Sequence, residues 1–419
     1  MNVTRMKPSG GMAGQISPTA RRGATLLAFT FPGQGSQRPG MGQPWVDHAS
    51  WSVVEEASDV LGLDLGHLLL EADADELVLT GNAQVATFLT SLVAFDALRR
   101  AGVVPAACAG HSLGEYSALT AAGAMSFTDG IRLVRARGDA MQRAATARPG
   151  SMAAVLGLDD EASEEACRRA GGDVWVANLN APGQVVLSGA AGALAAAGEA
   201  ARDLGARRVV PIPVGGAFHT PYMAPAADEL GAALAATTIR PPKVPVVANV
   251  DARLHRQAGE WAEVLLSQLC SPVRWHQSLQ SLADDGATTF VEVGPGGVLS
   301  GLTRRCLPDA GTVPVASPGD VDRLAEAADV HKLHPPTSPE GEHLHMAERL
   351  VVSPAAGVFQ PADRWRENLA GSRVEVGEVL GTVGSEEIRS GFAGVFMGII
   401  AHDGERVLPS QPIAWLRTA

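Results

Sequence analysis

Residues 106–122 read AACAGHSLGEYSALTAA, and this stretch decides the fold predicted for the chain. The small residues Ala106–Ala109 predict a short buried strand, and Glu115–Ala122 predict a helix. Between them lies Gly110-His111-Ser112-Leu113-Gly114. The two glycines allow a sharp turn from strand to helix because they have no Cβ to collide with the backbone.

The same alternation of strand and helix extends outward from this stretch. Thr25–Phe31 (TLLAFTF) is an apolar run that stops at Pro32-Gly33, which is typical of a buried strand followed by a tight loop. Ala83–Ala101 has the apolar periodicity of a helix. We therefore predict an α/β fold, a hydrolase-like parallel-sheet domain built from residues 25–147 and 214–317.

The intervening residues, 148–213, have a different pattern. They predict a strand-helix-strand-strand-helix-strand order, which is that of a ferredoxin-like subdomain inserted into the larger domain. The predicted strands are Met152–Leu156, Val174–Ala177, Val185–Leu187 and Arg208–Ile212, and the predicted helices are Glu161–Ala170 and Ala191–Leu204.

Both ends of the chain lie outside these two regions. Residues 1–24 contain Arg and Lys but no acidic residue and no apolar core of signal-peptide length, so we expect a disordered leader and no secretion. Residues 318–348 are rich in Pro, His, Asp and Glu and predict a linker. Residues 349–419 contain short apolar segments separated by Gly, which indicate a small all-β domain.

Composition excludes several classes of protein. The 419-residue chain has a formal net charge of −12, which argues against a nucleic-acid partner, since phosphate contacts need clustered Lys and Arg. No apolar run reaches membrane-spanning length, so no membrane association is expected. The four cysteines are widely spaced and fit neither a metal site nor a disulfide framework, which favours a cytoplasmic protein.

Ser112 is the candidate nucleophile. It stands at the centre of a Gly-x-Ser-x-Gly motif between a predicted strand and a predicted helix, the context that a nucleophile elbow requires. The backbone N–H of Leu113, at the start of the helix, can then help to hold an oxyanion. The alternative is a glycine-rich turn whose serine caps the helix.

A serine needs a base to take its proton, and the chain has eleven histidines. His111 is a poor candidate, because neighbouring side chains on a sharp turn point apart. His219 lies in the small-residue loop Gly215-Gly216-Ala217-Phe218-His219, which follows a predicted strand and can bring an imidazole close to a ligand. The alternative for His219 is an ordinary loop histidine.

Five motifs, in order, resemble those of malonyl-CoA:acyl-carrier-protein transacylases. They span about two-thirds of the chain, from Thr25 to Arg305, and five ordered matches are far more specific than any one of them. The motifs are Phe31-Pro32-Gly33-Gln34-Gly35-Ser36-Gln37, Gly110–Tyr116, the Asn178/Asn180/Pro182/Gly183/Gln184 segment, Gln268-Leu269 with Pro272-Val273-Arg274-Trp275, and Glu292-Val293-Gly294-Pro295-Gly296.

The resemblance implies a role for each matching residue. Ser112 would be acylated and His219 would act as its general base. In this family a backbone carbonyl orients the histidine, and here it would be that of Gln268. Gln34 and the Leu113 N–H would form the oxyanion hole.

Arg137 matches the arginine that binds the substrate carboxylate in this family. A planar guanidinium can grip a carboxylate through two parallel hydrogen bonds, which lysine cannot do. An uncharged acetyl group would leave the buried charge unpaired. From the sequence alone, the alternative is a surface arginine on a helix with Arg132 and Arg135.

Phe218, immediately before His219, would fill the space that an α-methyl branch needs, so the resemblance implies malonyl rather than methylmalonyl selection. Phe at this position is the form found in modular synthases, whereas stand-alone enzymes usually have a polar or small residue. Fatty-acid and polyketide synthesis therefore both remain open.

The implied reaction transfers malonyl from malonyl-CoA to the phosphopantetheine thiol of a holo acyl carrier protein through a malonyl-serine, with no metal or redox cofactor. The alternatives are a serine esterase or thioesterase on the same elbow, and a non-catalytic scaffold acting through the C-terminal domain.

Val351–Leu416 resembles biotinyl/lipoyl carrier domains, which form a barrel-sandwich. The hairpin position that carries their modified lysine holds Gly384-Ser385-Glu386-Glu387-Ile388, and the last lysine of the chain is Lys332.

Overall fold

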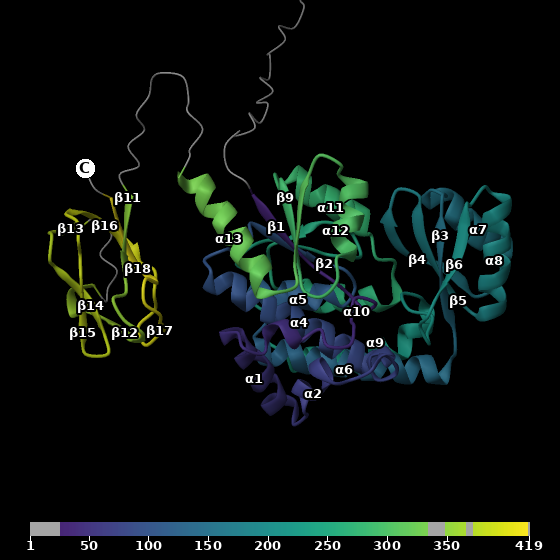
Figure 1. Ribbon diagram of the computed structural model, residues 1–419, viewed down its shortest axis with the longest axis horizontal. Helices are drawn as coiled ribbons and strands as arrows, with labels where there is room; N and C mark the ends of the chain where they lie inside the picture. Colours follow the sequence, from purple (N-terminus) through teal and green to yellow (C-terminus); the bar gives the residue numbers. More distant parts are fainter. Residues whose placement is uncertain (1–25, 334–347, 366–371, 418–419) are drawn as a thin grey trace, which may run out of the picture. The chain divides into compact units, whose positions relative to one another are not determined.

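The computed structural model describes residues 26–333, 348–365 and 372–417 (Figure 1). The chain divides into two units, residues 1–336 and 337–419, and each is described by itself. The leader predicted at residues 1–24 lies outside the described residues. Within the described ranges, no helix combines the length and the apolar character needed to cross a membrane.

A six-stranded sheet forms the centre of the first unit (Figure 1). Its strand order is β10-β9-β1-β2-β7-β8; all neighbours are parallel except β7 and β8, which are antiparallel. The predicted α/β class is therefore confirmed, with a mixed sheet. The strands are β1 Leu27–Phe31, β2 Ala107–Gly110, β7 Val246–Val247, β8 Leu254–His255, β9 Thr289–Val293 and β10 Gly311–Val315.

Successive residues of β1 point to opposite faces of this sheet, as a strand requires. Phe29 and Phe31 belong to one core, shared with the long helices α4 and α6, whereas Ala28 belongs to a second core with α11 and α12. Helices therefore cover both faces (Figure 1). The bounds of these helices and of the short one after β2 are α4 Thr80–Arg100, α5 Gly114–Ala121, α6 Phe127–Ala147, α11 Trp275–Asp284 and α12 Val298–Cys306.

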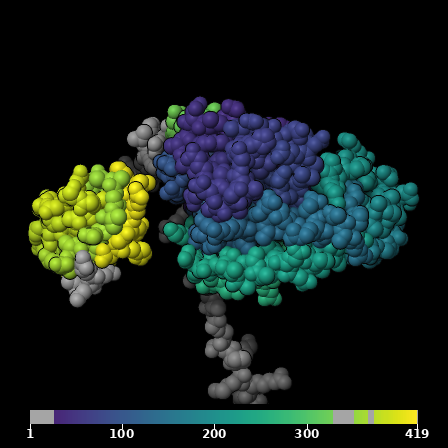
Figure 2. All heavy atoms as spheres, turned by 90° about the horizontal axis from the view of Figure 1, so that it is seen from below, coloured from purple at the N-terminus to yellow at the C-terminus, as the bar shows by residue number. Residues whose placement is uncertain are grey.

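The remaining helices extend the larger of these two cores. Helix α6 packs against α4 on one side and against α9 on the other. Figure 2 shows this layer from outside, with the N-terminal segments in purple and blue beside those of residues 220–270 in teal and green. The remaining bounds are η1 Gln43–Trp45, η2 Ala49–Trp51, α1 Ser52–Leu61, α2 Leu65–Leu70, α3 Ala74–Val78, η3 Pro221–Met223, α9 Ala224–Ala235 and α10 Trp261–Cys270.

Helices α4 and α6 approach closely because glycines face each other at their crossing. A Cβ on Gly138 would lie 2.8 Å from the Cα of Gly81, so position 138 has no room for a side chain without a backbone shift. This contact brings Gln84 on α4 next to Arg137 on α6, and the two side chains are hydrogen-bonded.

A small four-stranded antiparallel sheet is inserted between α6 and η3. Its elements follow the order predicted from the sequence, strand-helix-strand-strand-helix-strand, and the strands are arranged β4-β5-β3-β6. The backbone of Leu179, on β4, donates to the carbonyl of Val273, which ties this subdomain to the larger domain. The bounds are β3 Ser151–Leu156, α7 Asp160–Ala170, β4 Val174–Ala181, β5 Gln184–Gly189, α8 Ala191–Asp203 and β6 Arg208–Ile212.

The predicted linker at residues 318–348 is wrong in its first half. Pro318–Leu333 forms a helix, α13, which packs against α4 and β10. Val321 and Leu324 are buried in the main core, one helical turn apart. These two side chains, with the partly buried Ala325, dock the described part of the helix on the core.

The second unit consists of two four-stranded sheets, β11-β18-β16-β13 and β15-β14-β12-β17. The all-β prediction for residues 349–419 is confirmed over the residues that the structure describes. Its core includes Phe359, Trp365 and Phe396. The bounds are β11 Glu348–Val352, β12 Gly357–Pro361, η4 Asp363–Trp365, β13 Arg373–Val374, β14 Val379–Val383, β15 Glu386–Arg389, β16 Gly394–Ile399, β17 Arg406–Val407 and β18 Pro412–Arg417.

Candidate active site

The turn between β2 and α5 presents Ser112 at the carboxyl end of the central sheet. Ser112 has a φ of +52°, a left-handed conformation that a non-glycine residue adopts only under constraint. The flanking glycines make the turn possible. A Cβ on Gly114 would lie 2.0 Å from the carbonyl oxygen of Phe31, and one on Gly110 would lie 1.9 Å from the backbone of Gly114. The predicted elbow geometry is therefore present.

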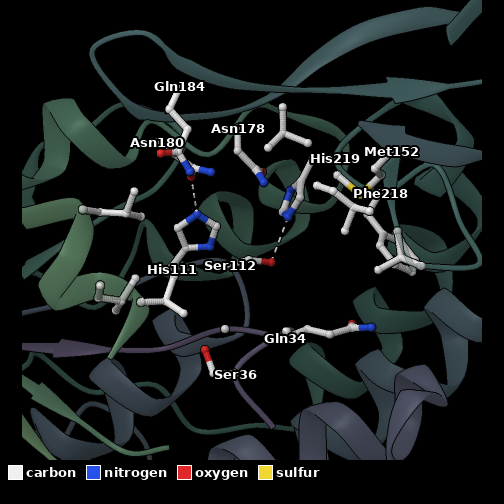
Figure 3. A pocket seen from close by; sticks show the side chains of 18 of the residues that line it. Gln34, Ser36, His111, Ser112, Met152, Asn178, Asn180, Gln184, Phe218 and His219 are labelled. Atoms are coloured by element: carbon white, nitrogen blue, oxygen red, sulfur yellow. Dashed lines mark hydrogen bonds between the residues drawn. The ribbon is translucent and has the colours of Figure 1, made fainter. Parts of the chain in front are cut away.

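The side chains of Ser112 and His219 are in hydrogen-bond contact (Figure 3). Ser112 Oγ lies 2.8 Å from His219 Nε2, and His219 Nδ1 lies 2.9 Å from the carbonyl oxygen of Gln268. Because a carbonyl can only accept, Nδ1 carries the proton and Nε2 is free to accept the proton of the serine. The arrangement is that of a nucleophile, its base and an orienting group.

Burial keeps His219 neutral. Its side chain is almost fully buried, and this burial, together with the nearby charge of Arg137, lowers the pKa of His219 to about 3. The hydrogen bond from Nδ1 to the Gln268 carbonyl acts in the opposite direction. His219 is therefore in the base form throughout the neutral range.

Arg137 contacts Ser112 and is 1% exposed, so the alternative of a surface arginine is wrong. Its Nη1 donates to Gln84 Oε1 (2.8 Å), and its Nη2 donates to Gln268 Oε1 (2.9 Å) and to Ser112 Oγ (3.2 Å). Its Nε is buried and has no hydrogen-bond partner among the described residues. The guanidinium forms no ion pair with any described carboxylate, which leaves a buried positive charge beside Ser112.

The other sequence-predicted residues lie around the same cleft. Gln34 lines it (Figure 3). Leu113 occupies the N-cap position of α5, so its N–H belongs to the positive end of that helix. Phe218 is buried in the wall beside His219. The structure therefore brings together every residue singled out from the sequence as a site residue.

The cleft has a volume of about 220 Å³ and lies between the central domain and the inserted subdomain. Its apolar wall comes from the subdomain strands, from α6 and α12, and from the loop after β6, and the elbow contributes polar groups. His111 points away from the nucleophile and contacts Asn180 Oδ1 at 2.8 Å, as Figure 3 shows, so it is not placed to act as the base. The apolar wall residues are Met141, Met152, Val186, Ile212, Val214, Phe218, Val298, Leu299 and Leu302.

Sequence reasoning missed three residues that hold this site together. Gln84 accepts from Arg137. Asn249 accepts from the backbone N–H of Ser112 through Oδ1 (2.7 Å) and donates to the Gly110 carbonyl through Nδ2 (2.7 Å). Glu115 is fully buried and accepts from the backbone N–H of Asn249. The sequence signal for Gln84 was a polar side chain within an apolar segment, and Glu115 lies within the Gly110–Tyr116 motif.

Comparison with known proteins agrees with this geometry. The family model described as "Acyl transferase domain" matches residues 28–335. The malonyl CoA-acyl carrier protein transacylase of Bacillus subtilis (strain 168) is 44% identical over 301 residues, which are 71% of this chain and 95% of that protein.

Solved structures give the same result. An acyl-carrier-protein S-malonyltransferase from Burkholderia pseudomallei 1710b is 40% identical, with a TM-score of 0.70, over 72% of this chain and 100% of its own. A malonyl-transacylase in complex with its type II PKS acyl-carrier protein is 37% identical, also with a TM-score of 0.70, over 72% of this chain and 100% of that chain. The family model and these relatives cover most of the chain, and the chain belongs to the acyl transferase domain family.

Proposed function

We propose that this protein transfers a malonyl group from malonyl-CoA to the phosphopantetheine thiol of an acyl carrier protein, for fatty-acid or polyketide synthesis. The observation that carries the proposal is the buried guanidinium of Arg137, whose Nη2 lies 3.2 Å from Ser112 Oγ. A charge buried in this way is stabilised by an anionic ligand. A short acyl group with a free carboxylate can bind the guanidinium while its thioester carbon reaches the serine.

The reaction proceeds in two steps. His219 Nε2 takes the proton of Ser112, and Oγ attacks the thioester carbonyl. Gln34 and the Leu113 N–H stabilise the oxyanion, which collapses to the malonyl-serine ester and expels coenzyme A with the proton from His219. The pantetheine thiol then gives its proton to His219 and attacks the ester, which releases malonyl-carrier and returns the proton to Ser112.

Transfer to a thiol rather than to water distinguishes this function from that of an esterase or thioesterase. Radiolabelled malonyl-CoA alone should label the protein, and the label should persist and then move to added holo-carrier. Rapid release of free malonate would support a hydrolase. A protein that takes no label would support a scaffold role.

The low pKa of His219 predicts an unusual pH profile. A histidine of ordinary pKa, near 6.5, would be protonated below about pH 6, and acylation would slow. Because the pKa of His219 is lowered to about 3, its base form persists as the pH falls. We expect kcat/KM for malonyl-CoA to keep most of its neutral value down to about pH 5. The check is a profile from pH 5 to 8, and an acid limb centred between about pH 6 and 7 would contradict the assignment.

The wall of the cleft at Phe218 favours an acyl group without an α-methyl branch. Phe218 is buried beside His219, and its ring fills space in the cleft wall, so an α-methyl branch has less room there. One methyl group supports a preference of about 10- to 200-fold for malonyl over methylmalonyl.

For the second unit we propose a biotinyl/lipoyl-like barrel-sandwich without a carrier function. Two four-stranded sheets and a tight β14–β15 hairpin at Gly384-Ser385 support this proposal. The hairpin has no lysine, so no biotin or lipoate can be attached there through an amide. Intact mass after co-expression with a biotin ligase or a lipoate ligase should be unchanged; an added prosthetic group would contradict the proposal.

A further inference from the structure

Glu115, at the first turn of α5, is a buried carboxylate that the two-step mechanism does not use. Its side chain is fully buried. Oε1 accepts from the backbone N–H of Asn249 (2.9 Å), and Oε2 accepts from the side-chain Nε2 of Gln268. No described arginine or lysine forms an ion pair with it. A buried carboxylate held by two neutral donors is costly in free energy, which suggests that it serves the site.

The side-chain amide of Gln268 connects Glu115 to Arg137. Its Oε1 accepts from Arg137 Nη2 (2.9 Å), while its Nε2 donates to Glu115 and to the carbonyl oxygen of Ser112 (2.8 Å). An ionised carboxylate only accepts and a guanidinium only donates. The amide therefore has one orientation that satisfies both, with its oxygen toward Arg137.

Opposing influences act on the charge of Glu115. Burial raises the pKa of Glu115 to about 8, whereas the hydrogen bonds from Asn249 and Gln268 and the charge of Arg137 act to lower it. Both carboxylate oxygens accept N–H groups, an arrangement that suits the ionised form. In its ionised form Glu115 is joined to Arg137 through the Gln268 amide rather than by direct contact. Among the described residues, no carboxylate forms an ion pair with the guanidinium.

We infer that Glu115 is a positioning residue: by fixing the Gln268 amide it holds Arg137 in place for the free carboxylate of the acyl group, and so determines the preference for malonyl over uncharged acyl groups. The inference rests on the proposed function. Glu115 does not touch the substrate; it acts through Gln268 on Arg137.

Glu115→Gln tests this directly. The glutamine at position 115 can place its NH₂ against the NH₂ of Gln268, so that two donors face each other. If the Gln268 amide turns to avoid this contact, its own NH₂ faces the N–H groups of Arg137. We expect the ratio of kcat/KM for malonyl-CoA to that for acetyl-CoA to fall about 10- to 100-fold, the range expected for one hydrogen bond to a charged group. Glu115→Asp, which keeps an acceptor of the same charge, should restore part of the ratio. An unchanged ratio in Glu115→Gln would overturn the inference.

Glu292→Gln is the matched control. Glu292 is also buried, and its carboxylate accepts two backbone N–H groups, those of Leu299 (3.1 Å) and Ser300 (2.7 Å), at the start of α12. It forms no hydrogen bond with Arg137, Gln268 or Ser112. Its loss should leave the malonyl-to-acetyl ratio unchanged, and an equal fall in both variants would show that the effect is not specific to Glu115.

A double-mutant cycle separates action through Gln268 from general disruption. Gln268→Leu keeps the main-chain carbonyl that orients His219 but removes the amide, so it should lower the ratio by itself. Adding Glu115→Gln should then lower it no further, whereas additive effects would contradict the inference. If Glu115→Gln does not fold, Glu115→Asp, alone and combined with Gln268→Leu, completes the same cycle.

Labelling of Ser112 by a fluorophosphonate keeps the two proposals distinguishable, because it reports the reactivity of the serine without any acyl carboxylate. A wild-type protein that takes the fluorophosphonate but no malonyl group would refute the proposed function. If the wild-type protein takes both labels and the Glu115→Gln variant keeps the wild-type malonyl-to-acetyl ratio of kcat/KM, only the role of Glu115 is refuted.

Discussion

Ser112→Ala is expected to lower malonyl transfer by about 10⁴- to 10⁶-fold, the scale of loss when a serine nucleophile is removed. Alanine leaves the turn, the cleft and Arg137 in place but provides no oxygen to form the ester. The substitution also removes the acceptor of one Arg137 hydrogen bond. Because Arg137 and the cleft remain, malonyl-CoA should still bind, but no acyl-enzyme should form. The measurement is the transfer rate together with the intact mass of the protein after incubation with malonyl-CoA.

Ser117→Ala is the matched control for this substitution. Ser117 lies one turn further along α5, is fully buried, and its hydroxyl has no hydrogen-bond partner among the described residues. Replacing it should therefore leave transfer near the wild-type rate. If Ser112→Ala still formed a stable malonyl-protein, the nucleophile would lie elsewhere.

Arg137→Ala is expected to lower kcat/KM for malonyl-CoA by about 100- to 1000-fold, since truncating one partner of a buried charge pair has effects of this size. The value for acetyl-CoA should change much less or rise, because the unpaired charge that opposes an uncharged acyl group is gone. Arg137→Lys should recover only part of the malonyl activity, since an ammonium cannot offer two parallel donors. The measurement is kcat/KM for both thioesters.

Arg132→Ala is the control on the same helix. Arg132 is exposed on α6, five residues before Arg137, so its loss tests for a general effect of removing an arginine from this helix. Both of its kcat/KM values should match those of the wild type. Equal losses of malonyl and acetyl activity in Arg137→Ala would mean that the guanidinium supports the fold rather than selecting the acyl group.

A local pattern in the sequence predicts Ser112 as the nucleophile. Ser112 stands in a glycine-flanked turn between a strand and a helix, a requirement that neighbouring residues satisfy. His219 stands in a loop of small residues, and its assignment needed the family resemblance. The orienting carbonyl of Gln268 was assigned in the same way, since a backbone carbonyl has no sequence signature of its own.

The supporting residues could not be predicted because tertiary packing creates their roles. Gln84 reaches Arg137 only because Gly81 and Gly138 allow their helices to cross closely. The side chain of Gln268 joins Arg137 to Glu115 across three helices, and nothing in the spacing of these residues indicates that contact.

Helix α13 is an element that the sequence analysis predicted wrongly, as part of a linker. The composition of residues 318–348 taken together is typical of a linker. Among the described side chains of the helix, Val321 and Leu324 are buried and Ala325 is partly buried against the same core, too short a helical pattern to recognise within that segment. The main core provides the surface on which this helix packs, so its stability depends on residues far away in the sequence.

The central claim is that one guanidinium selects the acyl group that Ser112 receives. The most direct measurement is to incubate the protein with equal concentrations of malonyl-CoA and acetyl-CoA, weigh it, and locate the modified residue by peptide mapping. The account predicts a malonyl group on Ser112, with little acetylation. Acetylation in similar amount, or a malonyl group on a different residue, would contradict it.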